Sequence, residues 1–278
     1  MAVLELDDVS VTYRSAAGPV PAVRGVSLTV DTGSSLGLAG ESGSGKTTVT
    51  STVLRLLPKS ATVTGQVLLD GEDVLTMRWG RLRAVRWATA SVVFQGAMHA
   101  LNPVQRVGHQ IAEPIRLHEK SVSEPTARAR VGDLLEQVGL PSRVAQSYPH
   151  QLSGGQKQRV MIAMALATEP DFLIADEPTT ALDVTIQKQI LDLLMRLQAE
   201  HGMGLIMITH NMGVVAETAD RVIVQYKGRK MEEADVLSLF ESPKSNYTKA
   251  LLAALPDNAT GDRLPTVSDM MFEPAPGA

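Results

Sequence analysis

The feature that most constrains the fold of this chain is a short glycine-rich stretch, Gly40-Glu41-Ser42-Gly43-Ser44-Gly45-Lys46-Thr47. It fits the pattern G-x-x-x-x-G-K-[ST], a loop whose backbone N–H groups wrap the phosphates of a nucleotide. Because glycine has no Cβ, the backbone can curl inward and several N–H dipoles can converge on one anion. The pattern predicts that Lys46 reaches the β- and γ-phosphates and that the Thr47 hydroxyl binds Mg²⁺.

The residues on both sides of this loop strengthen the prediction. Residues 35–39 indicate a short buried strand, and residues 47–57 a helix that Pro58 ends. A strand, a glycine loop and a helix in this order place the phosphates at a helix N-terminus, where the dipole favours negative charge. Thr48, in the first turn of this helix, is included in the predicted nucleotide site. A chance glycine-rich turn is the alternative, but it would not explain the lysine, the threonine and both flanks.

Composition narrows the classes of protein that this chain can represent. Its 278 residues suffice for one large α/β domain, or for a core with a smaller attached subdomain. The net charge of −4 argues against a nucleic-acid partner. Four arginines interleaved with two tryptophans are therefore interpreted as a solvated face, at Arg78, Trp79, Arg81, Arg83, Arg86 and Trp87.

The chain contains no cysteine, which excludes disulfides, thiolate metal sites and an iron–sulfur cluster. No secretory signal is visible at the N-terminus, and no apolar run approaches the roughly 18 residues needed to span a bilayer. If the protein works at a membrane, we expect another subunit to hold it there.

Hydrophobic patterns predict how the chain is organised. Alternating strands at 3–13, 22–30 and 63–69 indicate an antiparallel region, and residues 100–150 look helical. Apolar strands at 172–175 and 205–208 enclose an amphipathic helix, which predicts a parallel sheet. A hairpin is expected from residue 221 onward. The last residues, 256–278, are predicted to be a loosely ordered tail because they are rich in Pro, Gly and Asp.

Two carboxylates follow the strand at 172–175. Asp176 would reach the carboxyl edge of the sheet, where it can serve as a second magnesium ligand beside the phosphate loop. Glu177 is the next residue, and Pro178 turns the chain away. A carboxylate in that place can face the water that attacks the γ-phosphate, as a general base or a positioning group. A solvated acidic pair at a strand end is the alternative.

A second glycine-rich stretch, residues 152–159, begins another helix. Ser153, Gly154 and Gly155 would present a hydroxyl and bare N–H groups to an anion, and Gln156 follows them. One nucleotide rarely needs two such sites from one chain. We infer that this second stretch serves a nucleotide held by a partner chain, with ATP between two subunits.

With these stretches in place, the chain resembles the nucleotide-binding subunit of an ABC transporter. Residues 40–47 match the Walker A loop of that family, residues 152–156 its LSGGQ signature, and residues 172–177 its Walker B strand with the catalytic glutamate. Residues 179–183 match the D-loop, which includes Asp183. His210 matches the switch histidine, and Gln95 the glutamine of the Q-loop.

The resemblance assigns roles to residues that would mean little alone. Tyr13, 33 residues before Lys46, fits the aromatic residue that stacks on adenine; an ordinary strand-face aromatic is the alternative. His210 would contact the γ-phosphate, although a lone histidine is more often a packed polar residue. Gln95 would touch Mg²⁺ and the loop that meets the membrane subunits; a polar residue at a strand end is the competing interpretation.

The resemblance also implies the fold: an α/β P-loop NTPase with a RecA-like parallel-sheet core, an N-terminal antiparallel β-subdomain and an inserted α-helical subdomain. The expected boundaries are 1–255 for the nucleotide-binding domain, with the helical subdomain at about 98–168, and 256–278 for the tail. The cofactors implied are ATP and Mg²⁺.

Further matches narrow the resemblance to importers of oligopeptides, dipeptides or nickel. They lie at 100–103, 148–152 and 246–256, although Ser245-Asn246 replaces the usual His-Pro and Asn211 stands where aspartate is common. The partners implied are two transmembrane permeases, a second ATPase subunit (a heterodimer is favoured over a homodimer) and an extracytoplasmic solute-binding protein. The implied location is the cytoplasmic face of the membrane.

Two other classes share these motifs. One is a soluble ATPase within a metabolic complex such as the phosphonate C–P lyase. The other is a DNA-repair or translation ATPase, but those usually carry a long coiled-coil insertion or two cassettes, and this chain shows neither.

Overall fold

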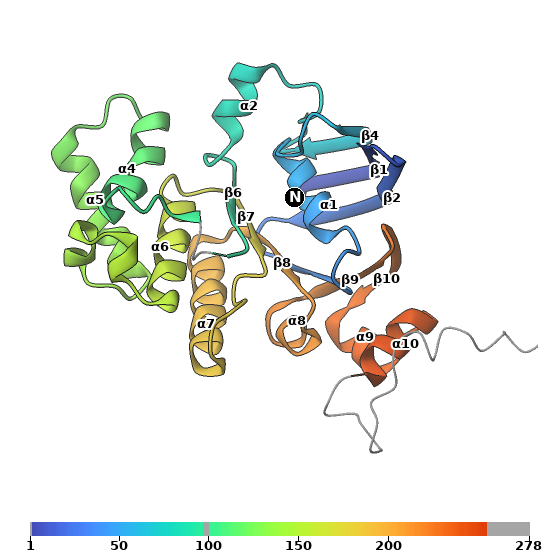
Figure 1. Ribbon diagram of the computed structural model, residues 1–278. Helices are drawn as coiled ribbons and strands as arrows, with labels where there is room; N and C mark the ends of the chain where they lie inside the picture. Colours follow the sequence, from blue (N-terminus) through green and yellow to red (C-terminus); the bar gives the residue numbers. More distant parts are fainter. Residues whose placement is uncertain (1, 97–99, 255–278) are drawn as a thin grey trace, which may run out of the picture.

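The computed structural model describes residues 2–96 and 100–254, so the predicted tail at 256–278 lies outside the described residues. Two sheets form the framework, and helices pack against them and at both ends of the parallel sheet (Figure 1). The architecture confirms the α/β class. Helices α4, α5 and α6 fall inside the stretch predicted as a helical subdomain, and the domain boundaries themselves stay a prediction.

The first sheet is antiparallel, with strand order β2-β1-β4-β5. Its strands are β1 (Ala2–Ser15), β2 (Gly18–Asp31), β4 (Ala61–Leu69) and β5 (Glu72–Asp73). The β4–β5 hairpin turns at Asp70 and Gly71, whose positive φ angles of 51° and 76° suit a two-residue hairpin turn. Alternating side chains of β1 are buried, among them Leu4 and Leu6. This sheet therefore has one face packed on the core.

The second sheet has the order β10-β9-β3-β8-β7-β6. It is made of β3 (Ser35–Ala39), β6 (Ala90–Val93), β7 (Phe172–Asp176), β8 (Gly204–Thr209), β9 (Arg221–Tyr226) and β10 (Arg229–Asp235). All neighbours pair in parallel except β9 and β10, which form the predicted hairpin. Parallel strands end at one edge, so the residues that follow β3, β6, β7 and β8 are brought into one row.

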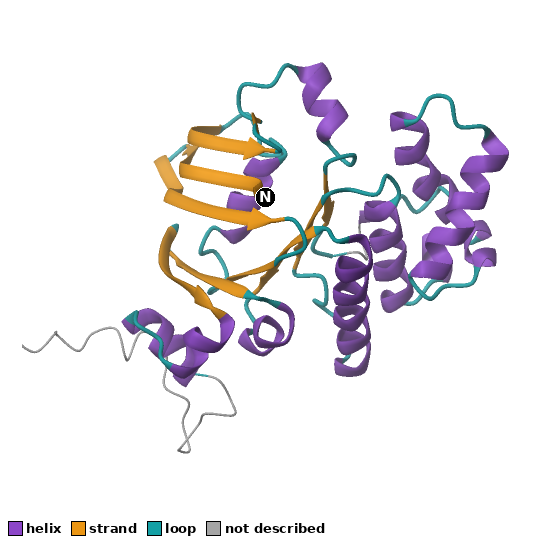
Figure 2. Cartoon of the chain, turned by 180° about the vertical axis from the view of Figure 1, so that it is seen from behind, coloured by secondary structure: helices purple, strands orange, loops and turns teal. Residues whose placement is uncertain are grey.

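The helices cover the sheets and form a separate layer at one end (Figure 2). Near the sheets lie α1 (Lys46–Val53), α2 (Trp79–Val85), α7 (Val184–His201) and α8 (Met212–Thr218). The separate layer contains α4 (Val107–His118), α5 (Glu124–Gln137), α6 (Gly154–Leu166) and the 3₁₀ turns Ser142–Gln146 and Pro149–Gln151. At the other end lie α9 (Val236–Glu241) and α10 (Asn246–Ala253).

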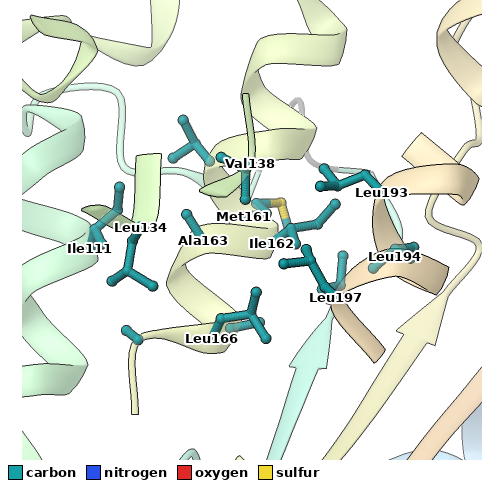
Figure 3. Close-up of a cluster of buried hydrophobic side chains, with 14 of the residues drawn as sticks. Ile111, Leu134, Val138, Met161, Ile162, Ala163, Leu166, Leu193, Leu194 and Leu197 are labelled. Atoms are coloured by element: carbon teal, nitrogen blue, oxygen red, sulfur yellow. The ribbon is translucent and has the colours of Figure 1, made fainter. Parts of the chain in front are cut away.

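The central strands divide their side chains between two cores. In β7, Leu173 and Ala175 face a cluster that includes α4–α7, whereas Phe172 and Ile174 face the antiparallel sheet and α1. Figure 3 shows part of the first cluster, where residues of α6 such as Ile162 and Leu166 meet α7 at Leu194 and Leu197. Burial on both faces explains why β7 and β8 are apolar up to their last residues, Asp176 and Thr209.

Helix α1 is shorter than the sequence predicts. It ends at Val53 rather than Leu57, because Arg55 takes a left-handed φ of 49° before Pro58 is reached. Arg86 stabilises this end: its guanidinium donates to the carbonyl of Leu54 at 3.0 and 2.7 Å and to that of Arg55 at 3.0 Å. The interpretation of four solvated arginines is therefore wrong for Arg86, whereas Arg78, Arg81 and Arg83 are exposed.

Within residues 2–96 and 100–254, no helix combines the length and the apolar character needed to cross a membrane.

The packing of the core predicts that substituting two leucines by alanine has very different effects on stability. Leu194 is fully buried between α6 and α7, whereas Leu237 on α9 is 73% exposed. We expect Leu194→Ala to lower the free energy of unfolding by about 2–5 kcal/mol, because it leaves a cavity. The same change at Leu237 is expected to stay within about 0.5 kcal/mol. Urea denaturation of both variants measures the difference, and equal effects would contradict the packing described above.

Candidate nucleotide-binding site

The phosphate loop joins β3 to α1 in a conformation that only glycine tolerates at two positions. Gly40 has a φ of 142°, and a Cβ there would lie 2.1 Å from the carbonyl oxygen of Gln225. Gly45 has a φ of 99°, and its Cβ would lie 2.4 Å from the carbonyl oxygen of Ala22. The loop therefore lies directly against β9 and β2, and it leads into the N-terminus of α1.

Lys46 lies inside the loop. Its Nζ donates to the carbonyl oxygens of Gly40 at 2.7 Å and Glu41 at 2.8 Å, and it is 3.4 Å from Ser44 Oγ. The residue is only 5% exposed. Burial lowers the pKa of Lys46, while nearby carboxylates, Glu177 first, raise it. The ammonium group is thus held where an anion entering the loop would meet it.

Thr47 and Asp176 lie together, as their predicted shared role requires. The Thr47 hydroxyl donates to Asp176 Oδ1 at 3.3 Å, joining the first turn of α1 to the end of β7. Burial raises the pKa of Asp176, and the Thr47 hydrogen bond acts in the opposite direction. No group of three or more His, Cys, Asp or Glu side chains suited to a metal occurs in the described residues. A hydroxyl and one carboxylate nevertheless fit Mg²⁺, which usually completes its shell with water and substrate phosphates.

Glu177 is held by three side chains. Its Oε1 lies 3.0 Å from His210 Nδ1, and its Oε2 accepts from Gln95 Nε2 at 2.7 Å and from Thr180 Oγ1 at 2.9 Å. Burial would raise the pKa of Glu177, but the hydrogen bonds from His210 and Thr180 outweigh it and hold the pKa below its ordinary value. The carboxylate is therefore ionised at neutral pH.

The backbone at Glu177 is also unusual. Its φ is 44°, a left-handed conformation that is rare for a residue with a Cβ, and its N–H donates to the carbonyl of Ile208 at 2.9 Å. Pro178 follows and turns the chain away from the sheet. Such local strain persists where the surroundings over-determine it, which is common at functional sites.

The start of the phosphate loop and the side chains around Glu177 line one cavity of about 370 Å³. Its lining is Gly40, Glu41, Ser42, Gln95, Glu177, His210 and Leu251. The phosphate loop, Gln95, Glu177 and His210 come from four separate strand ends, and the parallel sheet brings them together. Lys46, Thr47 and Asp176 are not among the lining residues, but Lys46 Nζ donates to the carbonyls of two of them, Gly40 and Glu41. An opening lined by the loop, a carboxylate and a histidine, with a lysine bonded to its wall, can bind a phosphate chain and position a water beside it.

The predicted signature residues do not line this cavity. Ser153 caps α6: its Oγ accepts from the N–H of Gln156 at 3.3 Å, and Gln156 Oε1 accepts from the N–H of Ser153 at 3.0 Å. Gly155 lets α6 approach α7, because a Cβ there would lie 2.7 Å from Ile186 Cγ2. Asp183 caps α7 by accepting from the N–H of Ile186 at 3.0 Å. Within this chain, Ser153, Gly154 and Gly155 form the start of α6, and Asp183 caps the start of α7.

Tyr13 lies on β1 beside the first turn of α1. Its hydroxyl is 3.3 Å from Thr48 Oγ1, and the residue is half-buried against the core that contains α1. The contact places the tyrosine next to the phosphate loop. Stacking on adenine stays a prediction.

Sequence reasoning missed four residues of this site. Gln225 is fully buried in β9 and donates to the carbonyl of Ser44 at 3.0 Å. Its polar side chain inside the apolar run 222–226 could have indicated a buried contact. Thr180 lies in the predicted D-loop, 179–183, but no role was predicted for it, and it donates to Glu177. Tyr247 and Leu251, both on α10, come from a distant part of the chain, which no local pattern could connect to the loop.

Comparison with known proteins agrees with this geometry. The protein family described as ABC transporter matches residues 23–180. The chain is 47% identical over 265 residues to the oligopeptide transport ATP-binding protein OppD of Mycobacterium tuberculosis, with 94% of this chain and 43% of the relative covered. It is 45% identical over 261 residues to OppD of Lactococcus lactis subsp. cremoris, with 93% of this chain and 77% of the relative covered. The chain thus spans less than half of the mycobacterial relative.

The fold is also similar to a solved ATP-binding cassette, a dimer in a post-hydrolysis state bound to ADP and Pi. The TM-score is 0.76 at 30% sequence identity, covering 84% of this chain and 98% of that one.

The loop geometry predicts unequal effects for two glycines. Gly40→Ala would force a Cβ against the Gln225 carbonyl, so we expect it to lower the free energy of unfolding by about 2–4 kcal/mol. Gly43 also has a positive φ, 77°, but a Cβ there would meet nothing within 4 Å. Gly43→Ala should therefore lower the free energy of unfolding by only about 1 kcal/mol. Thermal denaturation of the two variants checks the order, and a larger loss for Gly43→Ala would show that the loop is shaped differently.

Proposed function

We propose that this chain, which belongs to the ABC transporter family, binds and hydrolyses ATP and so powers a multi-subunit importer. The observation that carries the proposal is the single cavity that Glu177, His210 and Gln95 share with residues 40–42 of the phosphate loop. The chain covers only 43% of the OppD of Mycobacterium tuberculosis. The activity of a whole transporter subunit is therefore part of this proposal.

ATP would bind with its phosphates against the N–H groups of residues 40–47 and the Lys46 ammonium group. The carbonyl oxygens of Gly40 and Glu41 now accept from Lys46 Nζ, and phosphate oxygens would compete for this donor. Thr47 and Asp176 would hold Mg²⁺, together with Gln95. The ion supplies charge neutralisation at the phosphates when it is bound. Tyr13 would stack on the adenine.

Glu177 would position the attacking water. Its carboxylate is ionised, faces the cavity and is fixed by Gln95, Thr180 and His210. Phosphoryl transfer requires little covalent chemistry from the protein, so orientation of the water and neutralisation of charge supply most of the rate. His210, 61% exposed and directed at Glu177, would contact the γ-phosphate.

The second subunit would complete the site. Ser153, Gly154 and Gly155 begin α6 and are not among the residues that line the cavity of their own chain, which supports their use on a nucleotide held by a partner. Asp183 would lie at the same contact. We favour a related but different ATPase chain as this partner over a second copy.

The importer would contain two transmembrane permeases and an extracytoplasmic solute-binding protein, with this chain held at the cytoplasmic face. Gln95 would transmit ATP binding to the permeases, since it contacts Glu177 and is followed by the segment that joins β6 to the helical layer. The names of the two OppD relatives support peptides as the solute.

The role of Glu177 predicts a separation of binding from turnover. Glu177→Gln keeps the shape of the side chain and removes the charge, so we expect ATP binding to persist and hydrolysis in the assembled complex to fall at least about 100-fold. Phosphate release measures the rate. The control is Glu136→Gln, an exposed glutamate on α5 that should leave the rate unchanged. Near-wild-type hydrolysis by Glu177→Gln would contradict the proposal that this residue positions the attacking water.

The identity of the partners can be tested by recovering the complex. Tagged Glu177→Gln protein is isolated from its native cells in mild detergent with ATP and Mg²⁺, and the bound proteins are identified by mass spectrometry. Two multi-span permeases and a second ATPase are the expected result. Recovery of soluble enzymes alone would contradict the importer and favour an ATPase of a metabolic complex.

A further inference from the structure

The C-terminal helix α10 lies against the nucleotide site, although the predicted machinery does not use it. The stretch 246–256 stands out in the sequence only as a resemblance to importer subunits, and no role follows from its composition. In the structure, α9 and α10 follow β10 and pack at the end of the sheet opposite the helical layer (Figure 1). Two of the residues on α10, Tyr247 and Leu251, reach the phosphate loop and its cavity.

A buried glutamate fixes the start of α10. Glu232 on β10 is 8% exposed, and its two carboxylate oxygens accept from the N–H of Lys244 at 2.7 Å and the N–H of Ser245 at 2.9 Å. Burial would raise the pKa of Glu232, but the hydrogen bonds from Lys244, Thr248 and Ser245, with the charge of Lys244, outweigh it and hold the pKa below its ordinary value. The N-terminus of α10 is therefore attached to the sheet by a charged acceptor, and the helix is fixed at that end.

Tyr247 connects α10 to the phosphate loop. Its side chain is 2% exposed, and its ring packs on that of Tyr226, with centroids 4.4 Å apart and planes tilted by 33°. Its hydroxyl accepts from the N–H of Glu41 at 3.4 Å. Burial raises the pKa of Tyr247 to about 12, so the hydroxyl is neutral at any physiological pH.

Leu251 lies one helical turn after Tyr247 on the same face of α10. It lines the cavity together with residues 40–42, Gln95, Glu177 and His210. On one face of α10, Tyr247 thus contacts the phosphate loop and Leu251 forms part of the wall of the cavity. Every other residue of that lining belongs to the loop or follows a strand of the parallel sheet.

Packing alone would not require a tyrosine at position 247. The ring belongs to an apolar cluster with Met212, Val215 and Val222, and phenylalanine would fill the same space. The hydroxyl adds one polar contact, directed at the first residue of the loop after Gly40. Glu41 is exposed, and its carbonyl accepts from Lys46 Nζ at 2.8 Å within the loop, so the Tyr247 hydroxyl adds a contact from a separate element.

We propose that α10 is a wall of the nucleotide site and that Tyr247 is a positioning residue, which holds the Glu41 segment of the phosphate loop in the shape that receives ATP. The inference rests on the proposed ATP binding by this loop. A loop that is already ordered loses less conformational entropy when the nucleotide binds. Tyr247 is bonded to the loop, whereas Glu177 is held by Gln95, Thr180 and His210, so the contribution of Tyr247 falls on affinity and not on the chemical step.

The test is Tyr247→Phe, which removes one oxygen atom, measured with a non-hydrolysable ATP analogue (AMP-PNP) and Mg²⁺ by titration calorimetry on the full chain. Losing one hydrogen bond to the loop is expected to raise the Kd about two- to tenfold. The control is Tyr226→Phe, which removes the hydroxyl of the stacked partner and keeps both rings. It should leave the Kd at the wild-type value. Melting temperatures of the nucleotide-free variants are measured alongside.

A raised Kd in Tyr247→Phe alone, with a melting temperature matching the control, supports the positioning role. Equal Kd values for wild type and both variants would overturn it, as would a Kd that rises equally in both variants with a loss of melting temperature, because that pattern reports packing. Absence of AMP-PNP binding by the wild-type chain would instead overturn the proposed function, and this inference with it. The two failures are thus distinguishable.

Discussion

The folding of residues 40–47 around the Lys46 ammonium group is the interaction on which the rest of the site depends. A buried cation is costly unless hydrogen bonds and opposite charge compensate for the lost water. Here the carbonyls of Gly40 and Glu41 supply the hydrogen bonds, and the carboxylates of Asp176 and Glu177 supply the charge. The same arrangement requires glycine at positions 40 and 45, where the loop touches neighbouring backbone.

The parallel sheet turns this local arrangement into a site. Strands β3, β6, β7 and β8 end at one edge, and each is followed by a residue that the site uses. Gln95, Glu177 and His210 are far apart in the sequence, but hydrogen bonds of 2.7 and 3.0 Å join them. The surrounding cores make the placement rigid, because β7 and β8 are buried on both faces. Rigid support of this kind is what orientation-based catalysis needs.

Much of this could be predicted from the sequence, for reasons that differ between elements. The phosphate loop, the β7 carboxylates and the β9–β10 hairpin have local signals: glycine spacing, an apolar run that ends in acids, and a Lys-Gly turn. The early end of α1 had none, because the arginine that stabilises it, Arg86, lies 32 residues away from Leu54. The same limit hid Tyr247, whose contact with Glu41 spans 206 positions. Contacts of that range are set by the tertiary fold and leave no periodic pattern.

The central claim is that residues 40–47 bind the phosphates of ATP through Lys46, and titration calorimetry of Lys46→Met with ATP and Mg²⁺ tests it most directly. Methionine keeps the length of the side chain and removes its charge. The matched control is Lys188→Met on α7, where the lysine side chain is 65% exposed. We expect saturable binding by the wild type and the control, and a loss of at least about tenfold in affinity for a folded Lys46→Met. Binding by Lys46→Met at the wild-type affinity would contradict the claim.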